Sequence, residues 1–188
     1  IYTVVPSAAS DVYKRQVLKW VRKKGCPWDT DTCAFAAQNG HLEILIWARQ
    51  NGCPWNIETC TFVAVTTGQI EILKWLHENG CPWNADTCMY AAQKSQYETL
   101  KWLHQHECPW DESTCTWLAK RGNLEMLKWV RHRGCPWDEN TCFAAKYHGQ
   151  LDIFEWARNN GCPYDEEEYN IRMSKNEYDT ILYIVFPK

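Results

Sequence analysis

The chain has 188 residues and a net charge of −3, with 23% charged residues of both signs and no block rich in Lys or Arg. This pattern lacks the basic surface typical of a nucleic-acid-binding protein, so we expect no nucleic-acid partner. No stretch approaches the roughly 18 consecutive apolar residues of a membrane-spanning helix, so we expect no membrane partner either.

The first sixteen residues differ from the rest of the chain because they precede the repeated pattern. The chain begins with Ile1, and residues 7–16, with the sequence SAASDVYKRQ, resemble the translation of a sequencing-library adapter. We therefore expect residues 1–16 to be a non-native leader and exclude them from the fold prediction. The second predicted region, residues 17–188, contains the repeats.

Residues 17–188 form a tandem array. The tetrad Cys-Pro-Trp-Asp or Cys-Pro-Trp-Asn recurs every 27 or 28 residues, ending with a Cys-Pro-Tyr-Asp variant, and its units start near Cys26, Cys53, Cys81, Cys108, Cys135 and Cys162. A fixed period of about 20 to 50 residues is typical of a solenoid, whose units bury their apolar faces by stacking on one another. The function is therefore expected on a repeated surface.

Each unit predicts a first helix that starts directly after the tetrad. In the first complete unit this helix is expected over Thr30–Asn39, with Asp29 as N-cap and with Trp28 and Cys33 at the two positions of a hydrophobic staple. Its buried face carries small side chains, which allow close helix packing. Equivalent N-caps are Asn56, Asn84, Asp111, Asp138 and Asp165.

The second helix of the unit is expected over His41–Gln50. Gly52 then stands where a left-handed C′ residue is favoured, and the proline two residues later cannot continue the helix. Glu107 replaces this glycine in one unit, which costs roughly 1 kcal/mol if the left-handed geometry is kept.

Eleven of the twelve tryptophans form two series, one in the tetrads and one in the second helices. The second-helix series is Trp20, Trp47, Trp75, Trp102, Trp129 and Trp156, and the tetrad series is Trp28, Trp55, Trp83, Trp110 and Trp137, followed by Tyr164. We expect these rings to fill the space between adjacent repeats. An exposed aromatic binding strip is the alternative.

The unit resembles an ankyrin repeat. Gly40–Leu45 and Gly52 match the family's Gly-His-Leu-Glu pattern and its terminal glycine, and Ala36 and Ala37 stand where the family has paired alanines. The units are shorter than the family's roughly 33 residues by the length of its β-hairpin, and they are similar to the short 27-residue Cys-Pro-Trp-Asp arrays of protists and large DNA viruses. This resemblance implies an all-α solenoid of about six stacked helix-turn-helix units with little or no β-hairpin.

The eleven cysteines raise the question of disulfides and metals. Equivalent cysteines of neighbouring repeats are expected about a helix diameter apart, beyond the roughly 7 Å Cα limit for a disulfide, and the two cysteines of one unit are expected to face different junctions. We interpret them as buried free thiols, which favours a reducing compartment, the cytoplasm or nucleus. A redox-responsive cysteine array, and a metal site at His104, His106 and Cys108, are the alternatives. We expect no bound metal or cofactor.

No pattern in the sequence indicates catalysis. The chain has no nucleophile elbow, no phosphate-binding glycine loop and no carboxylate pair distinct from those of the other repeats, so we predict no catalytic residue and no enzyme activity. As an alternative, the array is the substrate-recruiting segment of a larger enzyme or a ubiquitin-ligase adaptor whose other domain is missing from this fragment.

The resemblance also implies a binding surface on the concave face. Ankyrin repeats contact partners through variable positions of the first helix, which carry over to Phe35, Phe62, Tyr90 and Trp117 and to Gln38, Gln93 and Lys120. Aromatic residues there favour a protein-binding strip, since aromatic anchors contribute most to interface energy. The alternative is that these rings pack against loops of neighbouring repeats. We therefore predict a monomeric scaffold for protein–protein interaction.

Overall fold

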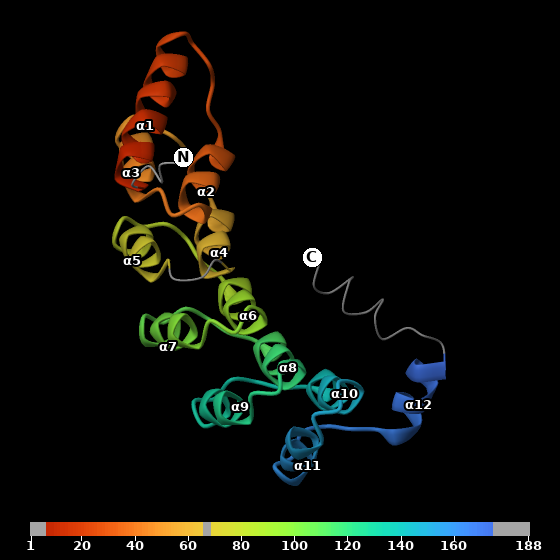
Figure 1. Ribbon diagram of the computed structural model, residues 1–188. Coiled ribbons are helices and arrows are strands. Elements are labelled where there is room, and N and C mark those ends of the chain that lie inside the picture. Colours follow the sequence, from red (N-terminus) through yellow and green to blue (C-terminus); the bar gives the residue numbers. More distant parts are fainter. Residues whose placement is uncertain (1–6, 66–68, 175–188) are drawn as a thin grey trace, which may run out of the picture. The chain divides into compact units, whose positions relative to one another are not determined.

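The computed structural model describes residues 7–65 and 69–174, and every regular element in these ranges is an α-helix (Figure 1). The first, α1, spans Ser7–Lys23 and includes part of the predicted leader. The later helices follow the repeats, a first and a second helix for each of five tetrads and one helix after the sixth. The predicted all-α solenoid class is confirmed, with no β-hairpin in the described ranges.

The chain divides into two compact units, residues 1–110 and 111–188, here called unit 1 and unit 2. In unit 1 the first helices are α2 (Thr30–Gln38), α4 (Ile57–Val65) and α6 (Ala85–Gln93), and the second helices are α3 (Leu42–Gln50), α5 (Ile70–Glu78) and α7 (Tyr97–Gln105). In unit 2 the first helices are α8 (Glu112–Lys120), α10 (Glu139–Tyr147) and α12 (Glu166–Ser174), and the second helices are α9 (Leu124–Arg131) and α11 (Leu151–Asn159).

Within unit 1 the first helices form one row and the second helices another (Figure 1). Small side chains allow this close packing, since Cys33, Ala36 and Ala37 of α2 are all at most 6% exposed. A buried contact of 3.3 Å between the hydroxyls of Thr61 and Thr87 joins α4 to α6. Unit 2 repeats this link between α8 and α10, where the first helices are again direct neighbours.

The first helices begin where the N-caps were predicted. The Asp29 carboxylate accepts a hydrogen bond from Thr32 N at 3.3 Å, and Asp111 accepts one from Ser113 N at 3.1 Å. Both N-cap residues have the extended backbone that a cap requires. The prediction is confirmed at these positions, and the helix bounds differ from the predicted ones by one residue.

The second helices end in the predicted left-handed turn. After α3, Cys53 N donates to Ala48 O and Gly52 N donates to Arg49 O, both at 3.0 Å, which is the Schellman pattern. Gly52 has a φ of +79°, and Glu107 takes the same conformation with a φ of +61° although it carries a Cβ. The strain predicted at Glu107 is therefore present.

In every tetrad after the first, the opening cysteine connects its loop to the preceding repeat. Cys53 Sγ donates to Asp29 O at 3.4 Å, and Cys135 Sγ donates to Asp111 O at the same distance. Each acceptor belongs to the N-cap residue of the previous first helix, so one thiol joins two successive loops. No helix in the described ranges is long and apolar enough to cross a membrane.

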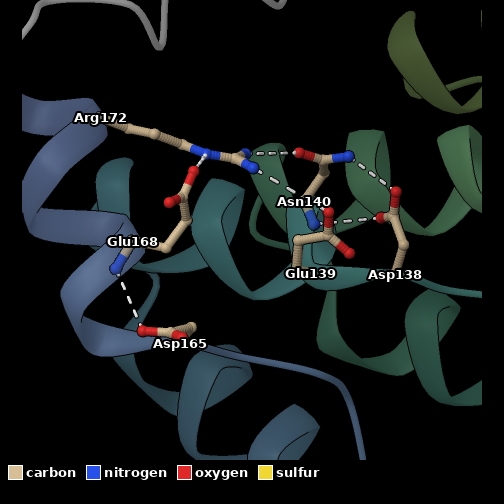
Figure 2. Close-up of polar contacts among 6 residues, drawn as sticks. All are labelled: Asp138, Glu139, Asn140, Asp165, Glu168 and Arg172. Carbon is tan, nitrogen blue, oxygen red and sulfur yellow. Dashed lines mark hydrogen bonds and ion pairs between the residues drawn. The ribbon is translucent and has the colours of Figure 1, made fainter.

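The last helix contacts α10 through charged and polar groups (Figure 2), and also through the ring of Tyr169, whose centre lies 5.9 Å from that of Phe143. Arg172 lies at the centre of this junction. Its Nε donates to Glu168 Oε1 at 2.8 Å and its Nη1 donates to Asn140 Oδ1 at 3.2 Å, while Glu139 lies 4.0 Å away. Its guanidinium also covers the ring of the fully buried Phe143 at 4.5 Å. A polar junction of this kind differs from the cysteine- and alanine-lined packing of the other first helices.

Candidate functional site

The predicted binding residues of unit 1 lie on α2 and α6. The ring of Phe35 is among the most exposed apolar side chains of the described chain, at 61%, and Gln38 one turn later is half-buried. Tyr90 and Gln93 hold the same two positions on α6 and are also half-buried. Burial, and then the charge of Asp86, raise the pKa of the Tyr90 hydroxyl, so this group is neutral at physiological pH.

The local sequence explains why these side chains point away from the core. In α6, Cys88, Ala91 and Ala92 have no exposed surface and form the packed stripe. Tyr90 stands between the members of this stripe, so it projects from the other side of the helix. The small core side chains and the outward aromatic are therefore two consequences of one helical period.

Unit 2 differs from the prediction at Trp117. Its side chain is only 6% exposed, so it does not extend an exposed aromatic strip. The Lys120 ammonium lies 4.7 Å from the centre of the Trp117 ring, and the Arg121 guanidinium lies 5.9 Å from it. These long side chains cover the indole while keeping their charges in water. The expectation of an exposed ring is wrong here, because side chains of the same repeat cover the indole.

The repeat after Trp117 has no exposed aromatic residue at the equivalent position. Phe143, one residue out of register in the next repeat, has no exposed surface, and Ala144 at the aligned position is also buried. No exposed aromatic side chain therefore takes the Phe35 position on α10, although the half-buried Tyr147 stands at the position of Gln38 and Gln93. Phe62 lies outside the described side chains, so its prediction is not tested.

Tryptophans and cations form a second repeated feature on the other side of unit 1. The Arg49 guanidinium lies 3.8 Å from the centre of the Trp55 ring, and Trp55 in turn meets Trp75 edge-on at 5.9 Å. The ring of His77 stacks on Trp83 at 4.1 Å in the next repeat. These groups bridge adjacent repeats as predicted, but they are half-buried and alternate with cations.

The sequence contains a signal for this arrangement that the sequence analysis missed. A cation or a histidine stands two residues after every second-helix tryptophan, at Arg22, Arg49, His77, His104, Arg131 and Arg158. In three repeats the arginine also donates to the carbonyl of the next tetrad cysteine, as Arg49 does to Cys53 O at 2.6 Å. The stacked cation therefore holds the tetrad loop against the preceding helix.

A shallow cavity of about 180 Å³ lies beside one of these stacks in unit 2. Its lining comprises Arg131, His132, Trp137, Trp156 and Asn160. The arginine already covers the Trp137 ring at 3.9 Å and donates to the Cys135 carbonyl, while Asn160 donates to Trp156 O at 2.8 Å. These polar groups are used by the protein itself, so the cavity does not present an arrangement for catalysis.

The cysteines are arranged differently from the prediction. The second cysteine of one repeat meets the first cysteine of the next, and the Sγ atoms of Cys115 and Cys135 are 3.6 Å apart. This pairing joins neither equivalent cysteines nor the two cysteines of one unit, the two kinds of pair for which the spacing was predicted. The hydrogen bond with Cys135, and then burial, raise the pKa of the Cys115 thiol, so it stays protonated. Nine of the ten described cysteines are buried free thiols.

The histidines of the suggested metal site have other partners. His104 stacks on Trp110 at 4.0 Å, whereas His106 stacks on Trp102 at 4.1 Å and its Nδ1 donates to the carbonyl oxygen of Trp102 at 2.9 Å. Among the described residues, no three His, Cys, Asp or Glu side chains are grouped so that they could hold a metal ion. The two histidines therefore serve as aromatic rings that stack on tryptophans.

Comparisons with known proteins agree with this architecture. The family model described as ankyrin repeats (3 copies) matches residues 33–114. The human ASB11 ankyrin repeat domain superposes with a TM-score of 0.55 at 15% identity, covering 70% of this chain and 69% of that one. The pentatricopeptide repeat protein PPR10, solved with an 18-nt psaJ RNA element, aligns with a TM-score of 0.40 at 13% identity over 92% of this chain and 37% of its own. No curated protein matches the chain in sequence. Residues 33–114 are thus similar to ankyrin repeats in sequence, and the chain shares its fold with an ankyrin repeat domain.

Proposed function

We propose that this chain is a non-enzymatic scaffold that binds a partner protein through the first-helix face of unit 1. Ankyrin repeats generally mediate protein–protein interactions. The observation that carries the proposal is the 61% exposure of Phe35, a large apolar ring on a helix whose other face is buried. Exposed aromatic residues are the side chains that most often anchor protein interfaces.

The neighbouring side chains suit the edge of such an interface. Gln38 and Gln93 each lie three residues after the aromatic residue of their helix, so their amides can donate to and accept from a partner backbone. Tyr90 adds a second ring with a polar tip. In unit 2, the Lys120 ammonium lies over the Trp117 ring. We therefore assign any partner contact there to the ammonium group and not to the indole.

Substitution of both anchors tests the proposal. The F35A/Y90A variant is expected to keep the helical circular dichroism of the parent and to lose capture of the cellular partner identified with the parent chain by cross-linking and mass spectrometry. Leu151→Ala is the matched control, since Leu151 is 62% exposed on the second helix α11. Retained capture by F35A/Y90A, or equal loss by the control, would contradict the proposal.

We further propose that the scaffold works as a monomer in a reducing compartment, the cytoplasm or nucleus. The buried free thiols support this assignment, because oxidising compartments favour disulfides. Light scattering coupled to gel filtration tests the oligomeric state, and a fluorescent fusion in the source cell tests the compartment. A dimer mass, or secretion of the fusion, would contradict the respective part.

A further inference from the structure

We propose that the segment bound by unit 1 is an extended basic peptide with Arg or Lys at every third position. This inference rests on the proposed function, and it names the chemistry of the partner. It follows from the charges on α2, α4 and α6, from the rings beside those charges and from the spacing of the three helices.

Each first helix of unit 1 carries one exposed carboxylate, at Asp31, Glu58 and Asp86. The three helices contain no Lys, Arg or His at all. The row of α2, α4 and α6 therefore has a charge of −3 with no compensating cation of its own. These carboxylates lie on the face that we assign to the partner. A basic segment is the complementary ligand.

These carboxylates are available for a partner. Among the described residues, Asp31 forms no ion pair, and the partners of Glu58 and Asp86 are the neutral side-chain amides of Asn56 and Asn84, at 3.4 and 2.9 Å. The second helices of the same unit behave differently. There Glu71 and Glu98 are each paired with a lysine three residues later, at 2.7 and 2.8 Å.

An aromatic ring stands next to the carboxylate on two of the helices. Phe35 follows Asp31 by four residues, and Tyr90 follows Asp86 by four, so the two groups share one face of their helix. The effect of the Asp86 charge on the Tyr90 hydroxyl is consistent with this proximity. A guanidinium group can stack on such a ring while it pairs with the carboxylate, which an apolar or acidic side chain cannot do.

The spacing of the helices sets the register of the peptide. Because α2, α4 and α6 pack directly side by side, equivalent positions recur at roughly 8 to 10 Å, the usual distance between packed helices. A chain in the polyproline II conformation advances about 3.1 Å per residue and returns to the same side every third residue, so about three residues cover one helix. A peptide that crosses the row therefore presents a cation to each carboxylate when Arg or Lys occupies every third position.

In unit 2, α8 and α10 lack these features and so provide an internal comparison, whereas α12 carries three glutamates, of which Glu166 pairs with Lys146 and Glu168 with Arg172. Ser113 and Asn140 stand where unit 1 has the carboxylates, two residues before the second cysteine. The ring of Trp117 is buried, and α8 and α10 carry Lys120 and Lys146. The basic peptide is therefore expected to bind the α2, α4 and α6 row of unit 1 in preference to α8 and α10.

The test uses the full chain and a fluorescein-labelled peptide of about nine residues, with Arg at the first, fourth and seventh positions of a Gly-Ser-Ala host. Fluorescence anisotropy is expected to show saturable binding that D31N/D86N weakens at least about tenfold, as expected for loss of charge and cation–ring contacts. The matched control E43Q/E98Q removes the same charge from α3 and α7, where both side chains are at least 70% exposed, and is expected to change the Kd less than about twofold.

Several results would overturn the inference. One is that a peptide with its three arginines adjacent binds as tightly as the peptide with spaced arginines. Another is that E43Q/E98Q weakens binding as much as D31N/D86N does, and a third is that the parent chain shows no saturable binding. A salt titration of the parent chain provides a readout that needs no variant, and binding unaffected between roughly 50 and 500 mM salt also contradicts the inference.

Failure of this inference can be told apart from failure of the proposed function. If F35A/Y90A loses the cellular partner and D31N/D86N keeps it, the face binds protein but the basic occupant is wrong. If F35A/Y90A keeps the partner, the face itself is wrong, whatever the peptide does.

Discussion

Phe35 in unit 1 and Trp117 in unit 2 occupy the same position of their repeats, two residues after the second cysteine. The first is 61% exposed and the second only 6%. The end of each helix contributes to this difference. In α8, Lys120 and Arg121 lie over the indole, whereas in α2 the equivalent residues are Gln38 and Asn39, and the Asn39 amide donates to the Phe35 carbonyl at 2.8 Å instead of covering the ring.

The position of a residue within the repeat does not by itself set the exposure of its side chain. The same helical period places both rings on the same side of their helices, but their exposure differs, and Lys120 and Arg121 cover only the second one. A binding face can therefore be confined to one part of an array whose backbone is regular throughout.

The largest expected effect separates the two rings directly. Trp117→Ala should lower the free energy of unfolding by about 3–5 kcal/mol, because it removes a buried aromatic side chain, whereas Phe35→Ala should change it by less than about 0.5 kcal/mol. Urea denaturation followed by far-ultraviolet circular dichroism measures both. Similar losses for the two variants would show that the rings are equally buried and would remove the basis of the comparison.

A smaller, equal effect is expected at the N-caps, which the two units share. Asp29→Ala in unit 1 and Asp111→Ala in unit 2 each remove a carboxylate that accepts from a backbone N–H, so each should cost about 1 kcal/mol. Thermal and urea unfolding measure the loss, with Asp→Asn as a control that keeps the cap. A large difference between the two sites would mean that the units differ in their framework and not only in their faces.

The C′ turn offers a gain in stability instead of a loss. Glu107→Gly should raise the free energy of unfolding by about 0.5–1 kcal/mol, since Glu107 has a φ of +61° and glycine adopts this region without strain. The reverse change at the equivalent position of unit 2, Gly134→Glu, should cost a similar amount. Circular dichroism of both variants provides the measurement, and a destabilised E107G would contradict the strain assigned to this turn.

The smallest expected effect is a pH dependence of the last helix of unit 2. Hydrogen bonds from Lys146 and then Tyr164 hold the pKa of Glu166 below its ordinary value. A lowered pKa in the folded state means that the stabilisation is present above the unfolded pKa and is lost as pH falls through the folded pKa. Hydrogen-exchange protection of residues 166–174 should therefore decrease below about pH 4. The E166Q variant should lack this decrease, and its persistence there would assign it to another carboxylate.

The sequence predicted the framework well because its signals are local. An aspartate before a helical period, a glycine at the left-handed C′ position and a proline after it act within a few residues, and Asp29 and Gly52 lie where these rules place them. Even the strained exception at Glu107 was predictable, since its cost depends only on its own backbone angles.

The contacts between repeats were not predictable in the same way. The pairing of Cys115 with Cys135 joins residues twenty positions apart, and the stack of Arg49, Trp55 and Trp75 joins two loops and two helices. Such contacts depend on how far each helix turns and tilts against the next. The recurrence of an arginine or a histidine after each second-helix tryptophan indicates the stack but not its geometry.

By itself, the sequence determined the period, the helix bounds and which side of each helix is small and apolar, because these follow from local backbone preferences and the 3.6-residue period. Only the tertiary structure decided which aromatic residues remain exposed. Exposure depends on the side chains that surround a ring in space, and the difference between Phe35 and Trp117 arises from such neighbours. The candidate binding face is consequently a property of packing, built on a framework that every repeat encodes.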